Sequence, residues 1–570
     1  MQDWERFCKH AVAIALFLNF EHILSKIDQP MVWNKPSDVQ LKKYPKVVLF
    51  KVLSGTSKTD KINDEHRKQI VLQRVKEKME RIKKETTAQV NENLQKMIKE
   101  IISDVQENKL LSEQTNKLLN NNYYDEIQDK IKTRKGHLPD KHFMERNSLL
   151  TDLLEIKHIQ TIYHIFLAIL FGLVVNTGVY DLLHKGQIRL GLDLIFRSFS
   201  NIQTVLFVWI CMFLSTFLIY IGFHFWANTR THLTPKSIKL KAWDRIFLCS
   251  FIVYIPWFIY NFTSSVLVYK LSVAESIAVL CELTRFLMKS YAFVRSNAPR
   301  VLAYKLNNED EEILCPEFTK YLYFLFAPTL IYKDNYPRTK HVRWNYVAFC
   351  FVEVLGCVLY ISFVFERFLV PVFENFGKKP YQWQDITMLI LGNGMAGILV
   401  LLCTFYAILH SWMNGNAEML RFGDRMFYKD WWTSTSYGRY YRTWNVVVHD
   451  WLYTYIYKDI YENVCPKNKL VAKFMVFFVS AVFHEYILGF AFRFCFPILF
   501  ILFFGFGLAV SFVKMQHSLL GNSGMWYGLA VGMGIGISTY CMEFYARINC
   551  PIENERIIDY FIPRSYTCNI

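Results

Sequence analysis

The residue in this sequence with the clearest capacity for chemistry is His484, which lies inside an apolar stretch that runs from Phe474 to Phe490. An ionisable side chain at membrane depth costs free energy, so such a residue is by default a candidate for function. Histidine has an ordinary pKa of about 6.5 and two ring nitrogens, which suit it to relay a proton near neutral pH. We therefore predict that His484 is a general base, although a structural role for a single histidine in a span is the alternative.

Polar neighbours of this histidine narrow the chemistry. Ser480 lies one helical turn earlier, so it can face the same cavity and either orient the imidazole or contact a ligand. Glu485 is about 100° further around the helix and cannot share that face. A zinc-protease motif is excluded, because the second histidine of H-E-x-x-H would fall at Leu488. Two other histidines in apolar stretches, His164 and His224, are interpreted as structural.

A second group of reactive residues precedes His484 in the chain. Between Phe427 and Tyr461, thirteen of thirty-five residues are aromatic, too many for an ordinary solvated loop. The polar residues interleaved with them or just beyond are Arg442, Asn445, His449, Lys458, Lys467 and Lys469. Such a set can bind the phosphates of a large anionic ligand while the rings stack on its base. The alternative is an interfacial aromatic belt with basic side chains that reach into the headgroup region.

The elements that position these residues are expected to be membrane-spanning helices. The chain has 570 residues, of which 52% are hydrophobic, and a span needs roughly 20 apolar residues. Such stretches lie at Thr161–Tyr180, Thr204–Trp226, Ile246–Val268, Trp344–Phe365, Ile386–Trp412, Lys469–Phe490, Pro497–Phe512 and Gly524–Phe544, with a weaker one at Leu271–Tyr291 that carries Glu275, Glu282 and Arg285. We predict an all-α polytopic membrane protein with about nine spans. The segment 413–468 is interpreted as re-entrant, with short helices around a cavity.

The distribution of charge and cysteine predicts the topology. Lysine and arginine are concentrated in segments 227–245, 292–343 and 413–468, which places these loops and the N-terminus in the cytosol and the C-terminus in the lumen. The net charge of +16 is then largely topological, and nucleic-acid binding is not favoured. Cys550 and Cys568 lie in the polar tail after the last span, where an oxidising lumen would let them form a disulfide.

Residues 1–140 are predicted to be a cytosolic extension, separate from a membrane domain at 141–570. The only apolar stretch before residue 150 is the short Ala11–Phe20, so no cleavable signal peptide is expected. From about 60 to 119 the chain is charged, and apolar residues recur at helical spacing between Val71 and Val105. This stripe predicts an oligomerising or partner-docking helix, and a solvated helix without a partner is the alternative.

Several motifs together resemble a known family. They are Phe427-Tyr-Lys-Asp-Trp-Trp432, the segment Arg442–Trp451, and Ser480-Ala-Val-Phe-His-Glu-Tyr486. This set resembles the membrane-bound O-acyltransferases, in particular the acyl-CoA-dependent branch that acts on sterols and diacylglycerol. The sterol O-acyltransferase (acyl-CoA:cholesterol acyltransferase) branch fits better, because it also resembles the segments Tyr291–Val301, Tyr321–Tyr332, Ala417–Asp424 and the tail from Cys550 to Cys568. The resemblance covers the chain from about residue 140 onward.

The resemblance implies an enzyme of the endoplasmic reticulum membrane that joins a long-chain acyl group from acyl-CoA to the 3β-hydroxyl of cholesterol or a related sterol. It implies a homodimer or homotetramer with no metal and no cofactor beyond acyl-CoA as co-substrate. His484 then matches the essential histidine, and Asn445 matches the asparagine that polarises the reacting groups. The residues implied to line the acyl-CoA site are Tyr440, Arg442, His449, Tyr453, Tyr457, Lys469 and Ser480. The conserved aromatic motif corresponds to Phe427, Tyr428, Asp430, Trp431 and Trp432.

One position departs from the family pattern. The motif normally ends Asp-Trp-Trp-Asn, whereas this chain has Thr433 after Trp432. A threonine offers one hydroxyl where an asparagine offers both a carbonyl and an amide. If the position is structural, threonine suffices as a cap or turn residue, whereas a direct substrate contact would alter activity. Two other functions remain in view: a diacylglycerol or long-chain-alcohol O-acyltransferase, and more distantly a lipid transporter.

Overall fold

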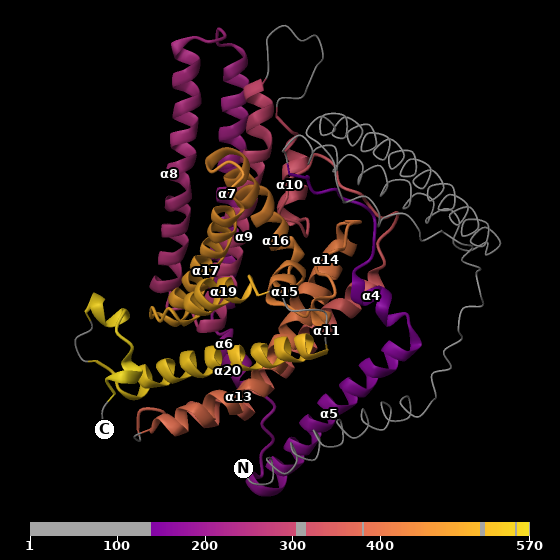
Figure 1. The fold of residues 1–570 in the computed structure, drawn as a ribbon, viewed down its shortest axis with the longest axis vertical. Helices are drawn as coiled ribbons and strands as arrows, with labels where there is room; N and C mark the ends of the chain where they lie inside the picture. The colour runs from indigo at the N-terminus through magenta and orange to yellow at the C-terminus, as the bar shows by residue number, and fades with distance from the viewer. Residues whose placement is uncertain (1–137, 304–314, 379–380, 514–518, 553–555, 569–570) are drawn as a thin grey trace, which may run out of the picture. The chain divides into compact units, whose positions relative to one another are not determined.

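The computed structural model describes residues 138–303, 315–378, 381–513, 519–552 and 556–568 (Figure 1). Throughout these ranges the regular structure is helical, and the only β-pairing consists of two isolated bridges. The α-helices are α4 Leu149–Leu154, α5 Lys157–Lys185, α6 Leu192–Ser198, α7 Ile202–Thr231, α8 Ile238–Val268, α9 Val273–Ala303, α10 Phe318–Phe326, α11 Trp344–Val364, α12 Val370–Phe373, α13 Trp383–Thr404, α14 Met413–Met419, α15 Tyr437–Thr443, α16 Val446–Leu452, α17 Lys469–Phe492, α18 Ile498–Phe500, α19 Leu508–Val510 and α20 Leu519–Asn549. The predicted all-α class is confirmed.

Short π-helical and 3-10 turns extend or join these helices. They are η1 Phe365–Leu369, η2 Phe405–Trp412, η3 Trp431–Thr433, η4 Tyr453–Tyr457, η5 Ile460–Val464, η6 Ile501–Gly507, η7 Ile557–Tyr560 and η8 Arg564–Tyr566. Two combinations matter for the site. The chain is continuously helical over 446–464, called here the 446–464 helix, and over 498–510, called the 498–510 helix. Segment 413–468 therefore contains the short helices α14 and α15 and the longer 446–464 helix, and its re-entrant course stays a prediction.

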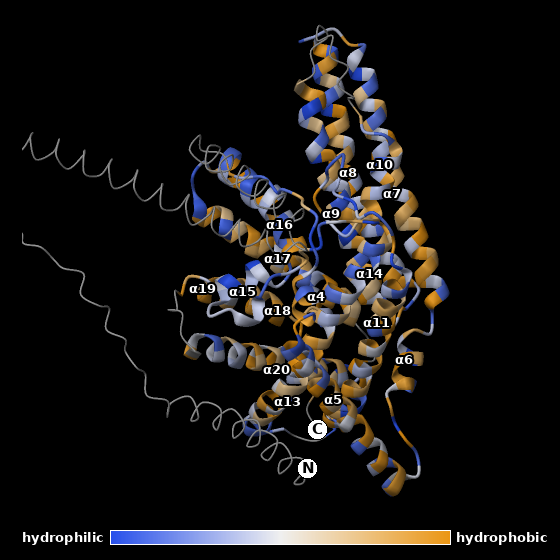
Figure 2. Cartoon of the chain, turned by 90° about the vertical axis from the view of Figure 1, so that its right-hand side faces the viewer, coloured by the Kyte–Doolittle hydropathy of each residue, from blue (hydrophilic) through white to orange (hydrophobic). Residues whose placement is uncertain are grey.

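Within the part of the chain that the structure describes, six helices are long and apolar enough to cross a membrane. They cover Lys157–His184, Ile202–Thr231, Ile238–Val268, Trp344–Phe373, Trp383–Met419 and Lys469–Phe492. The other three predicted spans also coincide with helices, namely α9, the shorter 498–510 helix and α20. Apolar side chains are exposed along α5, α7 and α8, as lipid-facing helices require (Figure 2). The protein is thus polytopic, and the total of nine spans stays a prediction.

The predicted N-terminal features lie outside the described residues. These are the apolar stretch Ala11–Phe20 and the striped helix at about 60–119. The proposed domain boundary near residue 140 coincides with the start of the described chain and also stays a prediction.

Helix α17 carries His484, and its two ends are fixed by specific contacts. Asn468 caps its start, because the Oδ1 atom accepts hydrogen bonds from the backbone N–H groups of Leu470 and Val471. Arg493 ends it in the left-handed conformation, with φ of 60°, and donates from Nη2 to the carbonyl oxygen of Leu271 at 3.0 Å. Between these ends α17 packs against α9 and the 446–464 helix.

Helices α13 and α20 lie side by side along their length (Figure 1). Glycines make the close approach possible. A Cβ atom on Gly534 would lie 2.3 Å from the carbonyl oxygen of Ile390, and one on Gly397 would lie 2.7 Å from Cβ of Met533. Small residues at such a crossing let two backbones pack directly, which is how many membrane helices associate.

The polar tail after α20 is bound to the loop that precedes α13. Cys550 and Cys568 form a disulfide, which confirms the predicted pairing. Gly377, with φ of 90°, lies against this bond, and a Cβ atom there would be 2.7 Å from Sγ of Cys568. Asn549 donates from Nδ2 to the carbonyl oxygens of Glu374 and Phe376, at 3.0 and 2.7 Å. The tail and the 374–377 loop therefore form one unit.

Candidate active site

A cavity of about 980 Å³ brings together three of the predicted site residues. Ser480 and His484 reach it from α17, and Asn445 reaches it from the start of α16. The rest of its lining is mainly apolar and comes from α7, α8, α9, η2, α14, residues 326–330 and further residues of α16 and α17. Most small-molecule sites are apolar cavities of about 300–1,000 Å³ with a few convergent polar groups. This cavity matches that description.

The geometry around His484 defines which ring nitrogen can act as a base. Nδ1 lies 2.7 Å from the backbone carbonyl oxygen of Ser480. A carbonyl oxygen can only accept, so Nδ1 carries the proton and Nε2 holds the lone pair. The side chain is exposed, yet it belongs to the interior, because it lines the cavity. The backbone of Ser480 therefore orients the imidazole, and the role of its side chain stays a prediction.

Asn445 combines a structural and a chemical capacity. It is the N-cap of α16, and its Oδ1 atom accepts a hydrogen bond from the backbone N–H of Val448 at 3.1 Å. The donor at Val448 identifies the amide atom near it as oxygen, so the Nδ2 group is left to donate elsewhere. Because Asn445 also lines the cavity, this amide is placed to donate to a ligand oxygen.

The aromatic motif holds the backbone on both sides of Asn445. The N–H of Lys429 donates to the carbonyl oxygen of Thr443 at 2.8 Å, and the N–H of Val446 donates to that of Phe427 at 2.9 Å. Phe427, Tyr428 and Trp431 are each only 1% exposed. The motif is thus a buried anchor, and it acts on the site through the position of Asn445.

A buried histidine that the sequence interpretation missed fixes the same motif. His410, in η2, is 5% exposed, and its Nδ1 atom lies 2.7 Å from the hydroxyl of Tyr428. Asn414 and Ser148 complete this polar cluster, with the Nδ2 atom of Asn414 lying 3.0 Å from the hydroxyl of Ser148. His410 is not part of the large cavity lining. The sequence could have indicated a role for His410, because this histidine, like His484, lies in an apolar stretch.

Thr433 makes a local structural contact. Its side chain is exposed, and its Oγ1 atom lies 2.8 Å from the carbonyl oxygen and 2.9 Å from Oδ2 of Asp430. Asp430 in turn forms an ion pair with Arg439 at 2.5 Å. The Thr433 hydroxyl therefore helps to orient the Asp430 carboxylate, which pairs with Arg439 of α15. Thr433 does not line the large cavity.

We expect Thr433→Asn to change the acyl transfer rate by no more than about twofold, as for other exposed positions outside a site. The asparagine amide can replace the threonine hydroxyl as donor to Asp430. Initial rates of the purified variant and the parent protein provide the measurement. A gain of tenfold or more would mean that this position contacts substrate.

The 446–464 helix displays a ladder of parallel rings. His449, Tyr453, Tyr457 and Tyr461 follow one another at intervals of four residues, with interplanar angles of 12°, 14° and 6°. Their centroids are 6.4, 5.7 and 6.1 Å apart. Three of the predicted acyl-CoA residues are therefore brought together, on a face of the helix that does not line the large cavity.

The remaining predicted acyl-CoA residues are more dispersed. Tyr440 is 7% exposed and packs against Trp431 and Trp444, with centroid distances of 5.9 and 5.6 Å. Burial raises the pKa of its hydroxyl well above the ordinary value. Arg442 and Lys469 are exposed. Tyr440 is thus a core residue in this arrangement, whereas the two cations are accessible to an anionic ligand.

Residues 138–141 bind along the 446–464 helix through residues that directly follow three members of the ladder. Lys141 pairs with Asp450 at 2.7 Å, Asp140 pairs with Lys458 at 2.5 Å, and the N–H of Leu138 donates to Glu462 at 2.8 Å. Burial alone would raise the pKa of the Asp450 carboxyl, but a hydrogen bond to His449 and the charge of Lys141 outweigh it and lower the pKa.

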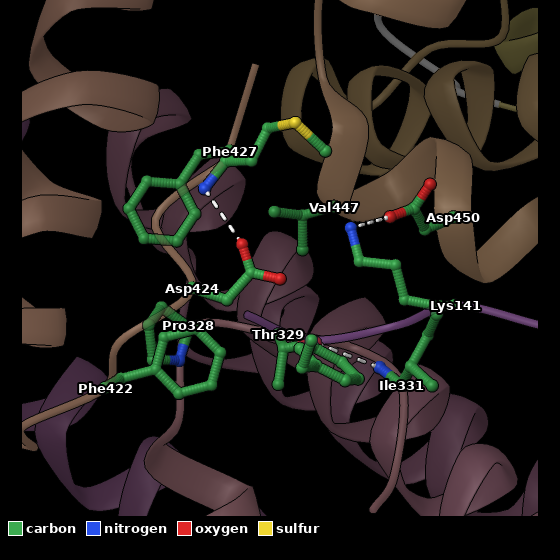
Figure 3. Close-up of a pocket in the computed structure, with 11 residues that line it drawn as sticks. Lys141, Pro328, Thr329, Ile331, Phe422, Asp424, Phe427, Val447 and Asp450 are labelled. Carbon is green, nitrogen blue, oxygen red and sulfur yellow. Dashed lines mark hydrogen bonds and ion pairs between the residues drawn. The ribbon is translucent and has the colours of Figure 1, made fainter. Parts of the chain in front are cut away.

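The Lys141–Asp450 pair borders a second, much smaller cavity, shown in Figure 3. Phe422, Phe427 and Val447 supply apolar walls, and the Asp424 carboxylate also reaches it. The cavity holds about 20 Å³, which suits a single water molecule. This space is too small for either an acyl chain or a nucleotide.

Charged residues of α9 form part of the large cavity wall, which sequence reasoning had not assigned. Arg285 pairs with Glu282 at 2.7 Å and donates to the carbonyl oxygen of Leu325 at 2.6 Å. Lys289, 1% exposed, donates to the carbonyl oxygens of Phe324 and Ala327 at 2.5 and 2.7 Å. These cations bind the carbonyls at the C-terminal end of α10, where the helix dipole is negative. Their presence in an apolar stretch is thereby explained.

Comparison with known proteins agrees with this architecture. The sequence profile of the membrane-bound O-acyltransferase family matches residues 194–542. Sterol O-acyltransferase 1 from Chlorocebus aethiops is 43% identical over 434 residues, which cover 75% of this chain and 78% of that protein. The Mus musculus protein of the same name is 42% identical over 434 residues, covering 75% and 79%. Sterol O-acyltransferase 2 from Homo sapiens is 43% identical over 434 residues, covering 75% and 80%.

The match includes α17 with its histidine, the aromatic motif and the helices that enclose the cavity. More than half of the chain fits the family profile, and the three relatives are 42–43% identical to it with 78–80% of their own length covered. This chain belongs to the membrane-bound O-acyltransferase family.

Proposed function

We propose that this protein is a sterol O-acyltransferase, which transfers a long-chain acyl group from acyl-CoA to the 3β-hydroxyl of cholesterol or a related sterol. The observation that carries the proposal is the large apolar cavity with His484 and Asn445 in its wall. The names and the 41–43% identity of the relatives support the sterol as acceptor.

The reaction fits the polar groups of the cavity. A sterol hydroxyl is a poor nucleophile at neutral pH, so a base that takes its proton during attack accelerates the step by about 10²–10⁴. Nε2 of His484 is the nitrogen with the lone pair, and it accepts that proton. The hydroxyl oxygen bonds to the thioester carbon, and the resulting oxyanion accepts a hydrogen bond from Nδ2 of Asn445. The C–S bond then breaks, and the proton passes from Nε2 to the CoA thiolate.

The acyl-CoA is proposed to bind along the cytosolic side of the same helices. Arg442 and Lys469 are exposed cations that suit its phosphates. The rings of His449, Tyr453 and Tyr457 offer stacking faces for its base, and their parallel arrangement supports this role. Ser480 lies deeper, on the large cavity, where the thioester would arrive. Tyr440 supports this site by packing against the motif.

We further propose that the enzyme resides in the endoplasmic reticulum membrane, with its N-terminus in the cytosol and its C-terminus in the lumen. The tail disulfide supports the lumenal position, because cysteines oxidise there and not in the cytosol. Assembly as a homodimer or homotetramer is part of the same proposal and follows from the resemblance to the family.

A substrate panel tests the proposed function. Purified protein is incubated with oleoyl-CoA and either cholesterol, diacylglycerol or a long-chain alcohol, and the lipid products are separated and quantified. We expect ester with cholesterol in excess of ester with the other acceptors. Ester with diacylglycerol or the alcohol alone would replace the sterol assignment by one of those acceptors, and no ester with any acceptor would reject the enzyme assignment.

A further inference from the structure

The imidazole of His484 has a second neighbour that lies outside the large cavity. Phe503, in η6 of the 498–510 helix, stacks on the ring with a centroid distance of 4.6 Å and an interplanar angle of 23°. Phe503 is absent from the cavity lining, whereas His484 is part of it. The phenyl ring therefore supports the imidazole from behind and does not contact the space where substrates bind.

Two contacts together fix the orientation of the imidazole. The hydrogen bond from Nδ1 to the Ser480 carbonyl oxygen, 2.7 Å long, fixes one edge of the ring. The phenyl ring of Phe503 limits rotation of the imidazole plane, because a nearly parallel ring occupies the space on one side. A hydrogen bond alone would still allow the plane to tilt about the Nδ1–oxygen direction. Phe503 supplies the second restraint that a single contact lacks.

The 498–510 helix is itself attached to α17 next to the histidine. Glu485 accepts a hydrogen bond from the backbone N–H of Phe500 at 3.0 Å, which satisfies an otherwise unpaired donor in the first turn of that helix. The same carboxylate accepts from the hydroxyl of Tyr540 in α20 at 3.0 Å. Phe503 follows Phe500 by less than one turn. The Glu485–Phe500 hydrogen bond, which starts at the residue after His484, therefore fixes where Phe503 lies relative to the histidine.

We infer that Phe503 is a positioning residue for the base, which keeps the imidazole aligned and stabilises the positive charge that the ring gains when it accepts the sterol proton. The inference rests on the proposed function. An aromatic face attracts a cation, and the attraction is strongest where water is excluded. During the reaction the proton leaves the hydroxyl oxygen for Nε2, so the charge on the imidazole exists only between attack and departure of the thiolate. An interaction confined to that interval affects kcat and leaves substrate binding unchanged.

The test compares variants with and without a ring at position 503. Phe503→Leu and Phe503→Met keep apolar volume without the ring, and two such variants are used so that the result does not depend on the folding of one. We expect each to lower kcat about tenfold, the size of a lost aromatic contact with a charged ring. The KM values for oleoyl-CoA and cholesterol should stay within about twofold of the parent enzyme. Phe503→Tyr should retain most of the parent kcat.

Phe504→Leu is the matched control. Phe504 lies in the same π-helical turn and also packs on α17, but against Phe474 and Phe478, with centroid distances of 4.8 and 5.6 Å. Neither of these two partners is ionisable. The same loss of a ring between the same two helices should leave kcat within about twofold of the parent value.

Three results would overturn the inference alone, given that the parent enzyme forms sterol ester. These are an unchanged kcat in both ring-less variants, a loss in Phe503→Tyr as large as in Phe503→Leu, and an equal loss in Phe504→Leu. A parent enzyme that forms no sterol ester would instead overturn the proposed function and this inference with it. Each variant is first compared with the parent enzyme by gel filtration in detergent. The kcat comparisons are made on the variants whose profile matches that of the parent.

Discussion

Replacement of His484 by alanine is expected to abolish measurable sterol ester formation while the protein stays folded. Among the described residues that line the large cavity, His484 is the only histidine, so the variant loses the acceptor for the hydroxyl proton. General-base catalysis contributes about 10²–10⁴ in rate, so the loss should be at least of this size. Initial rates with oleoyl-CoA and cholesterol, at saturating concentrations of both, give the measurement.

The matched control for this substitution is His224→Ala. His224 is also a histidine in an apolar helix, and its ring lies against Tyr220 with a centroid distance of 6.1 Å. It does not belong to the cavity lining, so activity should stay near that of the parent enzyme. Retained turnover in His484→Ala, or an equal loss in both variants, would contradict the assignment of His484 as the base.

The second large effect is expected at Asn445, where capping and chemistry must be separated. Asn445→Ala would remove both functions at once, because the loss of an N-cap costs about 1 kcal/mol of stability by itself. Asn445→Ser and Asn445→Asp keep an oxygen for the N–H of Val448 and remove the amide donor. We expect both variants to remain folded and to lose about 10²–10³ in kcat, the effect of one oxyanion donor. Kinetics and thermal unfolding of the same preparations provide the two measurements.

The aspartate variant should be the weaker of the two enzymes, since a carboxylate close to a developing oxyanion adds repulsion to the loss of the donor. A serine variant with nearly full activity would show that Asn445 serves α16 only as a cap. The role of oxyanion donor would then pass to another group of the cavity wall.

The sequence was sufficient to find the residues whose chemistry conflicts with their surroundings. His484 was identified because an ionisable group in an apolar helix is costly, and the Cys550–Cys568 pair because two cysteines lay in a polar tail. The same criterion could not separate His484 from His410. Both are histidines in apolar stretches, and only the structure shows that one faces the cavity whereas the other binds Tyr428.

Residues whose roles depend on distant partners could not be predicted. Arg285 made the span at Leu271–Tyr291 a weaker prediction, and Lys289 was not assigned a role. The acceptors of both side chains are carbonyls at the end of α10, about 35 to 40 residues further along the chain. Tyr440 matched a ligand position of the family, but its ring packs into the aromatic cluster around Trp431. By contrast, the ladder of rings from His449 to Tyr461 could have been predicted from the sequence, since residues four apart share one face of a helix.

The tail contact has a consequence for how the protein is made. Its two sides are residues 374–377, which precede α13, and three residues at or beyond the end of α20, namely Asn549, Cys550 and Cys568. Ribosomes synthesise these segments at different times, so Gly377 receives its partners only after α13 and α20 have both left the translocation machinery and paired. The contact between the tail and the 374–377 loop therefore forms only after the second half of the protein has been synthesised.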